Sequence, residues 1–534
     1  MTKKGSGTSL LFAMVFLSVA GSSAEQVDTA AVARIIDEGT NRSRVMESLG
    51  WLTDIFGPRL SWSPGFQKAG EWTMETLREW GLENVHREQW TPLGRGWTLE
   101  RYTAHVTTPT PFPLISYPKA WSPGTPGTVS GELIYLDART DSALESYEGR
   151  LAGKFVLLSE PVNVKPPFEP LATREVDSSL LAYANADPDL EPRSRRPSRF
   201  SGWVGRRMMQ RKKLQLCRDE GAAGLLTVSR RDGGNVMVQS ATIPDHPDTP
   251  YTSRRQAFET DPESTLPQVT VAAEHYNRLV RLLQKGENPR LEMSLEVAWT
   301  EPDSGFNVIG EIPGSDLRDE VVMIGAHLDS WHGGTGTVDN AVGVAACMEA
   351  VRILKALDLQ PRRTIRIALW GGEEQGLLGS RAYVKRHLGE RMRTPATDSA
   401  EAGIPTRYKP DAEKFSIYIN QDLGSGRIRG VLMNRNEALR PILRAWLTPF
   451  HKMNASTLTL NGTTNSDHAS FEAINITNIE FLQDKLDYFT RAYHGTMDLY
   501  ERALEEDLKQ ASIILAAFAY NAATREELMP RKPQ

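Results

Sequence analysis

The sequence has few cysteines and no large excess of positive or negative charge. Its 534 residues include two cysteines, Cys217 and Cys347, which excludes a disulfide-dense scaffold and any cysteine-rich zinc or iron–sulfur site. The 62 basic and 67 acidic residues give a net charge of -5, so no nucleic-acid partner is expected. Hydrophobic residues make up 40%, an ordinary globular value, and the length predicts two or three domains.

An apolar run from Leu10 to Ala20 lies near the N-terminus, after Lys3 and Lys4 and before the small residues 22–24. This arrangement is typical of a cleavable secretory signal. We therefore expect a signal peptide over residues 1–24 and export to a periplasm or the extracellular space. The run is short for a bilayer, so an uncleaved anchor is the alternative, and no stable membrane span is expected after cleavage.

The pattern of apolar and polar residues changes twice after this segment. A helical pattern repeats through Phe66, Ala69, Thr73 and Leu77, with Gly81 as a cap. Short β-type runs and a Pro- and charge-rich stretch at 161–199 follow. From Asn307 onward apolar strands alternate with amphipathic helices, which predicts an α/β three-layer sandwich with a mostly parallel central sheet.

Three successive predicted strands of that second half end in side chains that bind metals. The first runs into His327 and Asp329, the next into Glu373 and Glu374, and the third into Asp422. Two further candidates lie outside strands, Asp339 at the start of a helix and His494 in a loop before the last helix. Since ligands bind beyond the carboxyl ends of strands in open α/β sheets, we expect these groups to meet.

Each of these residues also has a structural interpretation, as a core histidine, a helix cap or a first-turn acid. The joint pattern favours a metal site. Imidazoles and carboxylates without thiolates suit zinc, and two histidines with three carboxylates suit two ions that share one carboxylate. Two ions can hold a bridging water and polarise a carbonyl, for which one further carboxylate would serve as general base.

Several motifs give the chain a likeness to a known family. They read HLDSW, GTGTVDN, LWGGEEQGLLGS, NQDLGSG, NSDHASF and YHGTMD. With them the chain resembles the co-catalytic zinc aminopeptidase family, and within it the carboxypeptidase Q (plasma glutamate carboxypeptidase) group. The resemblance implies a first domain part over 25–115, a β-rich protease-associated-like insert over 116–300 and the remaining catalytic domain over 301–534.

The same resemblance implies a role for each candidate residue. Two Zn²⁺ per chain would be bound, one by His327, Asp339 and Asp422, the other by Asp339, Glu374 and His494. Glu373 would be the general base. Asp329 would orient His327. Asp467 and His468 match a segment near the site without a firm role, and His332 is expected to be peripheral.

These features together predict a secreted di-zinc exopeptidase that removes N-terminal residues from peptides or dipeptides. Three alternatives stay open: a carboxypeptidase acting on short peptides, a glutaminyl-cyclase-type acyltransferase, and a catalytically inactive receptor-like binding module. The expected partners are a peptide or dipeptide substrate and, by resemblance, a second copy of the chain in a homodimer.

Overall fold

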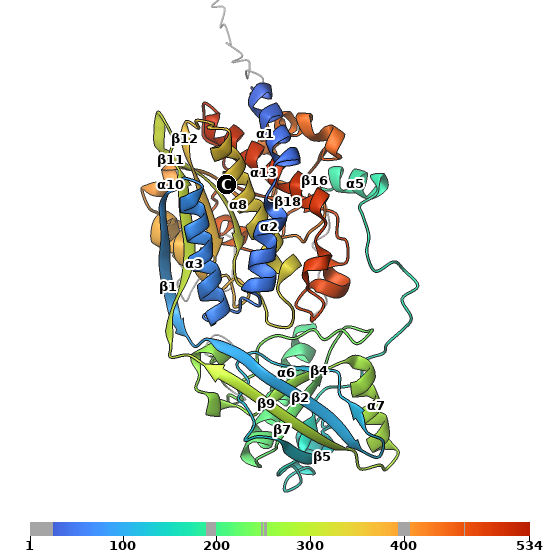
Figure 1. The fold of residues 1–534 in the computed structure, drawn as a ribbon. Coiled ribbons are helices and arrows are strands. Elements are labelled where there is room, and N and C mark those ends of the chain that lie inside the picture. The colour runs from blue at the N-terminus through green and yellow to red at the C-terminus, as the bar shows by residue number, and fades with distance from the viewer. Residues whose placement is uncertain are drawn as a thin grey trace, which may run out of the picture.

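The computed structural model describes residues 25–187, 199–246, 249, 254–392, 406–463 and 465–533. The expected signal peptide, residues 1–24, lies outside the described residues. Among the helices that are described, none is long and apolar enough to cross a bilayer. The chain forms two lobes, and each is built around an eight-stranded sheet (Figure 1).

The first lobe contains the sequence after residue 300 together with the N-terminal helices. The strand order of its sheet is β1 (Glu83–Gly94), β10 (Asp303–Ile312), β12 (Arg363–Trp370), β11 (Leu317–His327), β15 (Phe415–Asn420), β18 (Asn478–Gln483), β16 (Ile428–Leu432) and β17 (Thr457–Thr459). Its helices are α1 (Thr29–Asn41), α2 (Val45–Gly50), α3 (Pro64–Glu79), α8 (Val342–Ala356), α9 (Leu378–Tyr383), α10 (Asp411–Lys414), α11 (Arg440–Leu447), α12 (His468–Glu472) and α13 (Glu505–Thr524), beside a short hairpin of β13 (Gly389–Arg391) and β14 (Thr406–Tyr408).

This sheet is mixed, although its centre follows the prediction. The pairs β12–β11, β11–β15, β15–β18 and β16–β17 are parallel. The pairs β1–β10, β10–β12 and β16–β18 are antiparallel. Strand β10 passes through a short turn into β11, which reverses the chain, and β12 lies between the two. The three-layer α/β arrangement is therefore present with a mixed rather than a mostly parallel sheet.

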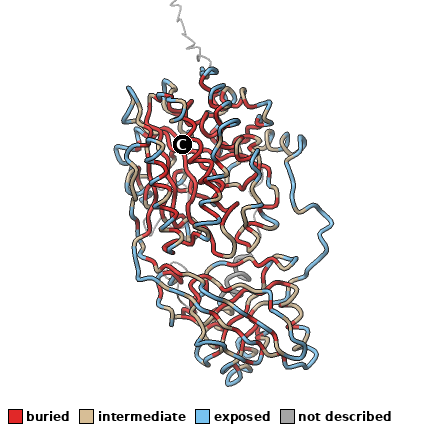
Figure 2. The backbone as a smooth tube through the Cα atoms, viewed as in Figure 1, coloured by how far each residue is buried: buried red, intermediate tan, exposed pale blue. Residues whose placement is uncertain are grey.

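Helices cover both faces of the first-lobe sheet. Alternate residues of β11 point to opposite sides: Val322 and Ile324 pack with α3, α8 and α13 in one core cluster, whereas Met323 packs with α9, α10 and α12 in another. The predicted helical pattern at Phe66 to Leu77 is confirmed as the buried face of α3, and Gly81 after it has a φ of 82°. Figure 2 shows that buried residues are densest inside this lobe.

The second lobe is formed mainly by the sequence between the first two strands of the first lobe. Its strand order is β3 (Phe112–Pro113), β2 (Trp97–Thr108), β9 (Arg290–Trp299), β5 (Val129–Tyr135), β6 (Phe155–Leu157), β7 (Gly224–Val228), β8 (Gln268–Val271) and β4 (Ser116–Pro118). Its helices are α4 (Asp141–Glu145), α6 (Arg199–Asp219) and α7 (Ala273–Gln284). Strands β2 and β3 belong to this sheet although they precede residue 116, the first residue of the expected insert.

The Pro- and charge-rich stretch after β6 crosses back to the first lobe, as Figure 1 shows for the segment that leads into α5 (Asp177–Ala184). Thr173 exchanges backbone hydrogen bonds with Leu486, and the Arg174 guanidinium lies 2.7 Å from the carboxylates of both Asp484 and Asp507. Helix α5 therefore lies inside the Pro- and charge-rich stretch, where no helical pattern is visible in the sequence. Residues 188–198 lie outside the described part. Cys217 is buried in a core cluster of the second lobe.

Candidate metal centre

The carboxyl ends of three adjacent strands of the first lobe bring the predicted ligands together. His327 is the last residue of β11, Glu374 follows β12 by four residues, and Asp422 follows β15 by two. Since β12, β11 and β15 are parallel neighbours, these three positions meet at one edge of the sheet. Asp339 and His494 reach the same place from the segments before α8 and after β18.

The five residues form two groups that share one carboxylate. In the first, His327 Nε2 lies 3.4 Å from Asp339 Oδ1 and 3.4 Å from Asp422 Oδ1. In the second, His494 Nε2 lies 3.4 Å from Asp339 Oδ2 and 3.0 Å from Glu374 Oε2. Ligand atoms about 2.0–2.2 Å from a tetrahedral zinc are about 3.4 Å from one another, so both groups have the spacing that zinc requires.

Several polar atoms of these residues also have no hydrogen-bond partner in the described part of the protein. Within these five residues, four buried atoms have no hydrogen-bond partner: His327 Nε2, Asp339 Oδ2, Glu374 Oε1 and Asp422 Oδ1. A buried polar atom without a partner costs about 1–3 kcal/mol, and more when charged. A hollow of about 10 Å³, the size of one small sphere, faces Asp339, Glu374 and His494. The residues therefore fit divalent cations, and nitrogen and carboxylate donors suit zinc.

The charges of the site point the same way. Burial, followed by the charge of Asp339, raises the pKa of Glu374 well above its usual range. Burial also raises the pKa of Glu373 strongly, with a further contribution from Asp422. Acidic groups that repel one another in a dry site need a positive charge to stay ionised, and bound cations supply it.

Asp339 is held by residues that the sequence-based assignment missed. The Asp498 carboxylate accepts hydrogen bonds from the backbone N–H groups of Val338 and Asp339, at 2.6 and 3.2 Å. The buried Arg59 guanidinium donates to four backbone carbonyls, including those of Leu328 and Gly336, which flank the loop of residues 329–335. Asp498 is the last residue of the motif YHGTMD, so that motif contained the residue without showing its role.

Asp329 contacts both His327 and the Glu373–Glu374 turn. The His327 Nδ1 atom lies 2.9 Å from the backbone oxygen of Asp329, whereas its distance to the Asp329 carboxylate is 3.7 Å. That carboxylate instead accepts hydrogen bonds from the N–H groups of Glu373 and Glu374 and from the Ser61 hydroxyl, at 3.1–3.3 Å. Asp329 therefore orients His327 through its main chain and the Glu373–Glu374 turn through its side chain.

The other three candidates lie near the centre without joining either group. Asp467 is fully buried, and burial raises the pKa of its carboxyl to about 7. His468 is tied into a polar network with Asn420 and Thr463. The His332 Nε2 atom lies 2.7 Å from the carbonyl oxygen of Pro118, and burial lowers the pKa of His332 to about 4. His332 is thus a neutral structural residue, as expected.

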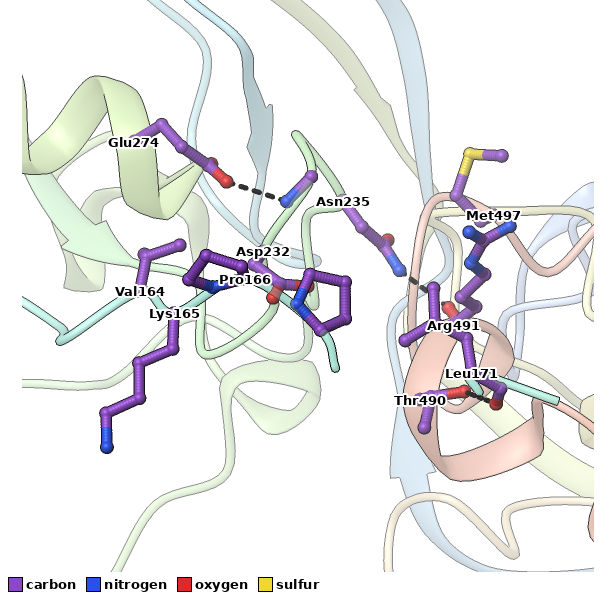
Figure 3. A pocket seen from close by; sticks show the side chains of 12 residues that line it. Val164, Lys165, Pro166, Leu171, Asp232, Asn235, Glu274, Thr490, Arg491 and Met497 are labelled. Carbon is purple, nitrogen blue, oxygen red and sulfur yellow. Dashed lines mark hydrogen bonds between the residues drawn. The ribbon is translucent and has the colours of Figure 1, made fainter. Parts of the chain in front are cut away.

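His494 lies at the border with the second lobe. It has a φ of 53°, and the Tyr493 ring stacks on it with centroids 3.7 Å apart. Its Nδ1 atom lies 2.9 Å from the Gln239 side-chain amide of the second lobe. A cavity of about 580 Å³ opens beside this loop, between Thr490 and Arg491 on one side and Asp232, Asn235 and Glu274 on the other (Figure 3).

Comparisons with known proteins agree with this geometry. Residues 307–519 match the profile of Peptidase family M28. Mouse carboxypeptidase Q is 24% identical over 504 residues, which cover 94% of this chain and 90% of that protein. Aminopeptidase YwaD of Bacillus subtilis is 26% identical over 240 residues, 44% of this chain and 49% of its own.

Solved structures share the fold over nearly the whole chain. A peptidase M28 precursor from Shewanella amazonensis superposes with a TM-score of 0.64 at 22% identity, covering 95% of this chain and 99% of that one. A zinc aminopeptidase from Bacillus subtilis superposes with a TM-score of 0.52 at 16% identity, covering 91% and 95%. The fold and site define a zinc metallopeptidase. The predicted resemblance to the co-catalytic zinc aminopeptidases, close to carboxypeptidase Q, is confirmed.

Proposed function

We propose that the protein is an exported di-zinc exopeptidase that releases N-terminal residues from short peptides or dipeptides. The observation that carries the proposal is the pair of ligand groups joined by Asp339, in which four buried side-chain atoms have no hydrogen-bond partner among the described residues. In this proposal one zinc is held by His327, Asp339 and Asp422, and the other by Asp339, Glu374 and His494. Bound zinc would polarise the substrate carbonyl and make a water acidic enough to attack it.

Glu373 is the proposed general base. Its backbone N–H is fixed by the Asp329 carboxylate at 3.1 Å. Within the described residues its own carboxylate accepts no hydrogen bond, so it is free to act on a substrate. Glu373 would take one proton from the attacking water while the water oxygen bonds to the peptide carbon. It would then give that proton to the departing nitrogen as the C–N bond breaks.

The acidic surroundings favour a substrate with a free α-amino group. The charges of Glu373, Glu374 and Asp422 act on one another, and these carboxylates can accept hydrogen bonds from an amino group but not from a carboxylate. We therefore place the substrate amino group on the side of Glu374 and His494. Carboxypeptidase action is the second candidate, because carboxypeptidase Q is similar over most of the chain.

Blocked dipeptides separate these two activities. Alanyl-leucine would be compared with its N-acetylated form and its C-terminal amide, on one zinc-loaded preparation. An aminopeptidase cleaves the free dipeptide and the amide but not the acetylated form. Cleavage of the acetylated form without cleavage of the amide would establish the carboxypeptidase. A chain that cyclises glutaminyl peptides without hydrolysing any dipeptide would be an acyltransferase, and one that binds peptide without turnover would be a binding module.

Three further parts of the proposal concern the whole chain. We propose that the second lobe, residues 116–300 with β2 and β3 added, is a protease-associated-like insert. Export rests on the sequence of residues 1–24 and is tested by N-terminal sequencing of the protein recovered from the culture medium or periplasm. The homodimer is tested by light scattering of the purified protein.

A further inference from the structure

A segment of the second lobe is paired with the loop that carries His494. The Val238 N–H donates to the His494 carbonyl at 2.9 Å, and the Thr496 N–H donates to the Val236 carbonyl at 3.0 Å. The side-chain amide of Asn235 donates to the Arg491 carbonyl at 2.8 Å, a bond drawn in Figure 3. Residues 235–239, named here the docking segment, thus hold the backbone on both sides of the histidine.

Gln239 ends the docking segment with its side chain on the histidine ring. Its amide nitrogen Nε2 lies 2.9 Å from His494 Nδ1. Its backbone is fixed from the other side, because the Ala120 N–H donates to the Gln239 carbonyl at 3.1 Å. Gln239 is exposed, whereas His494 is 8% exposed. The Gln239 amide therefore lies at the Nδ1 side of the His494 ring, whereas the Nε2 side faces the carboxylates of Asp339 and Glu374.

The two ring nitrogens of His494 have separate tasks. Nε2 lies 3.0–3.4 Å from Glu374 and Asp339, so it is the atom that must offer a lone pair to a cation. A neutral imidazole then carries its hydrogen on Nδ1 and needs an acceptor there. A glutamine amide has an acceptor oxygen and a donor nitrogen of nearly equal shape, and a half-turn exchanges them. After that half-turn the Gln239 oxygen would face Nδ1 and accept its hydrogen, which would fix the tautomer that binds metal.

The ring of His327 is oriented by a residue of its own lobe. Its Nδ1 atom lies 2.9 Å from the backbone oxygen of Asp329, two residues along the chain. A main-chain oxygen cannot be exchanged by a side-chain substitution, and it is fixed by the strand that precedes it. The two metal-facing histidines therefore differ in which lobe orients them.

We infer that Gln239 is a positioning residue for His494, and that the second lobe through it sets the affinity of the zinc held by Glu374 and His494. The inference rests on the proposed function, because it concerns a ligand of the proposed metal centre. Loss of a hydrogen-bond partner of a metal-binding histidine typically weakens metal affinity by about 10–100-fold. The effect should fall on one of the two ions.

The test is a zinc titration of the metal-free full chain against a chromophoric chelator, with zinc content measured by elemental analysis. In wild type we expect two ions. In Gln239→Ala we expect one ion to be weakened by about 10–100-fold and the other to be unchanged. Gln239→Glu should bind both ions as tightly as wild type or more tightly, because its carboxylate accepts from Nδ1. Ser240→Ala is the matched control, since the Ser240 hydroxyl donates only to the Ala241 carbonyl next to it.

A second experiment, in the Asp422→Ala variant, shows which of the two zinc ions is weakened by Gln239→Ala. Asp422→Ala removes a ligand from the His327 group alone, so the zinc that remains is the one near His494, and adding Gln239→Ala should weaken it by the same factor. The inference is overturned if Gln239→Ala binds both ions like wild type, weakens both equally, or is matched by Ser240→Ala. A wild-type chain that binds no zinc would instead refute the proposed function, and this inference with it. Melting curves of the metal-free variants check that each is folded.

Discussion

The two halves of the metal centre are built in different ways. In the half around His327, the histidine and Asp422 lie at strand ends of one sheet, and the histidine is oriented by a main-chain oxygen two residues away. In the half around His494, the histidine lies in a loop with a left-handed backbone, and its ring contacts a side chain 255 residues away in sequence. The first half follows from local sequence, whereas the second depends on how two lobes meet.

Asp339 belongs to both halves, so its replacement gives the largest expected effect. Asp339→Asn removes a negative charge and one anionic donor from each ligand group. We expect loss of zinc from both halves and turnover below detection, measured by elemental analysis and dipeptide hydrolysis. Asp411→Asn, at the exposed start of α10, is the control. If Asp339→Asn kept one tightly bound zinc, the shared carboxylate would be ruled out.

Glu373 tests the chemistry without dismantling either half. Glu373→Gln should lower turnover by about 10²–10⁴-fold, the range for loss of a general base, with zinc content unchanged. The exposed Glu413→Gln serves as the matched control. Near-normal turnover of Glu373→Gln with full zinc would contradict the assignment of the base.

The core of the second lobe provides a more distant way to weaken the His494 half. Phe155 is fully buried among the strands of that lobe, and Phe155→Ala should cost about 3–5 kcal/mol of stability. We expect calorimetry to show the second lobe unfolding at a lower temperature, and zinc near His494 to be released first. Release of both ions together would show that the lobes do not differ in this way.

Ser61 tests the hydrogen bonds of Asp329, which contacts His327 and the Glu373–Glu374 turn, against the single contact of Gln239. Its hydroxyl donates to Asp329 Oδ2 at 3.1 Å, and the same carboxylate also accepts from two backbone N–H groups. Since those bonds remain in Ser61→Ala, we expect a loss of about 0.5–1.5 kcal/mol, measured as a two- to tenfold change in zinc affinity. A loss as large as that of Gln239→Ala would remove the contrast between the halves.

The contrast explains what could be predicted from the sequence. Strands ending at His327 and Asn420 and the buried face of α3 follow from the local spacing of apolar residues. The antiparallel β1 and β10 could not be predicted, because strand direction is decided by partners far away in sequence. Helix α5 was hidden in a polar stretch, since it is held by contacts with the first lobe rather than by a buried face of its own.

The residues of the metal centre also divide into those whose position could be predicted from the sequence and those whose role could not. The five ligand candidates lie in motifs with regular positions relative to strands, so their convergence could be predicted from order alone. The task of the Asp329 carboxylate and the contact of Gln239 depend on the folded arrangement. Neither leaves a local pattern, because a single aspartate or glutamine occurs in many turns for other reasons.

The most direct test of the central claim is the zinc content of the purified wild-type chain, measured by elemental analysis and paired with dipeptide hydrolysis before and after chelation. We predict about two zinc ions per chain, and hydrolysis that stops on chelation and returns with zinc. One zinc per chain with cyclisation of glutaminyl peptides and no hydrolysis would contradict the account. So would a chain that neither binds zinc nor turns over peptide after zinc is restored.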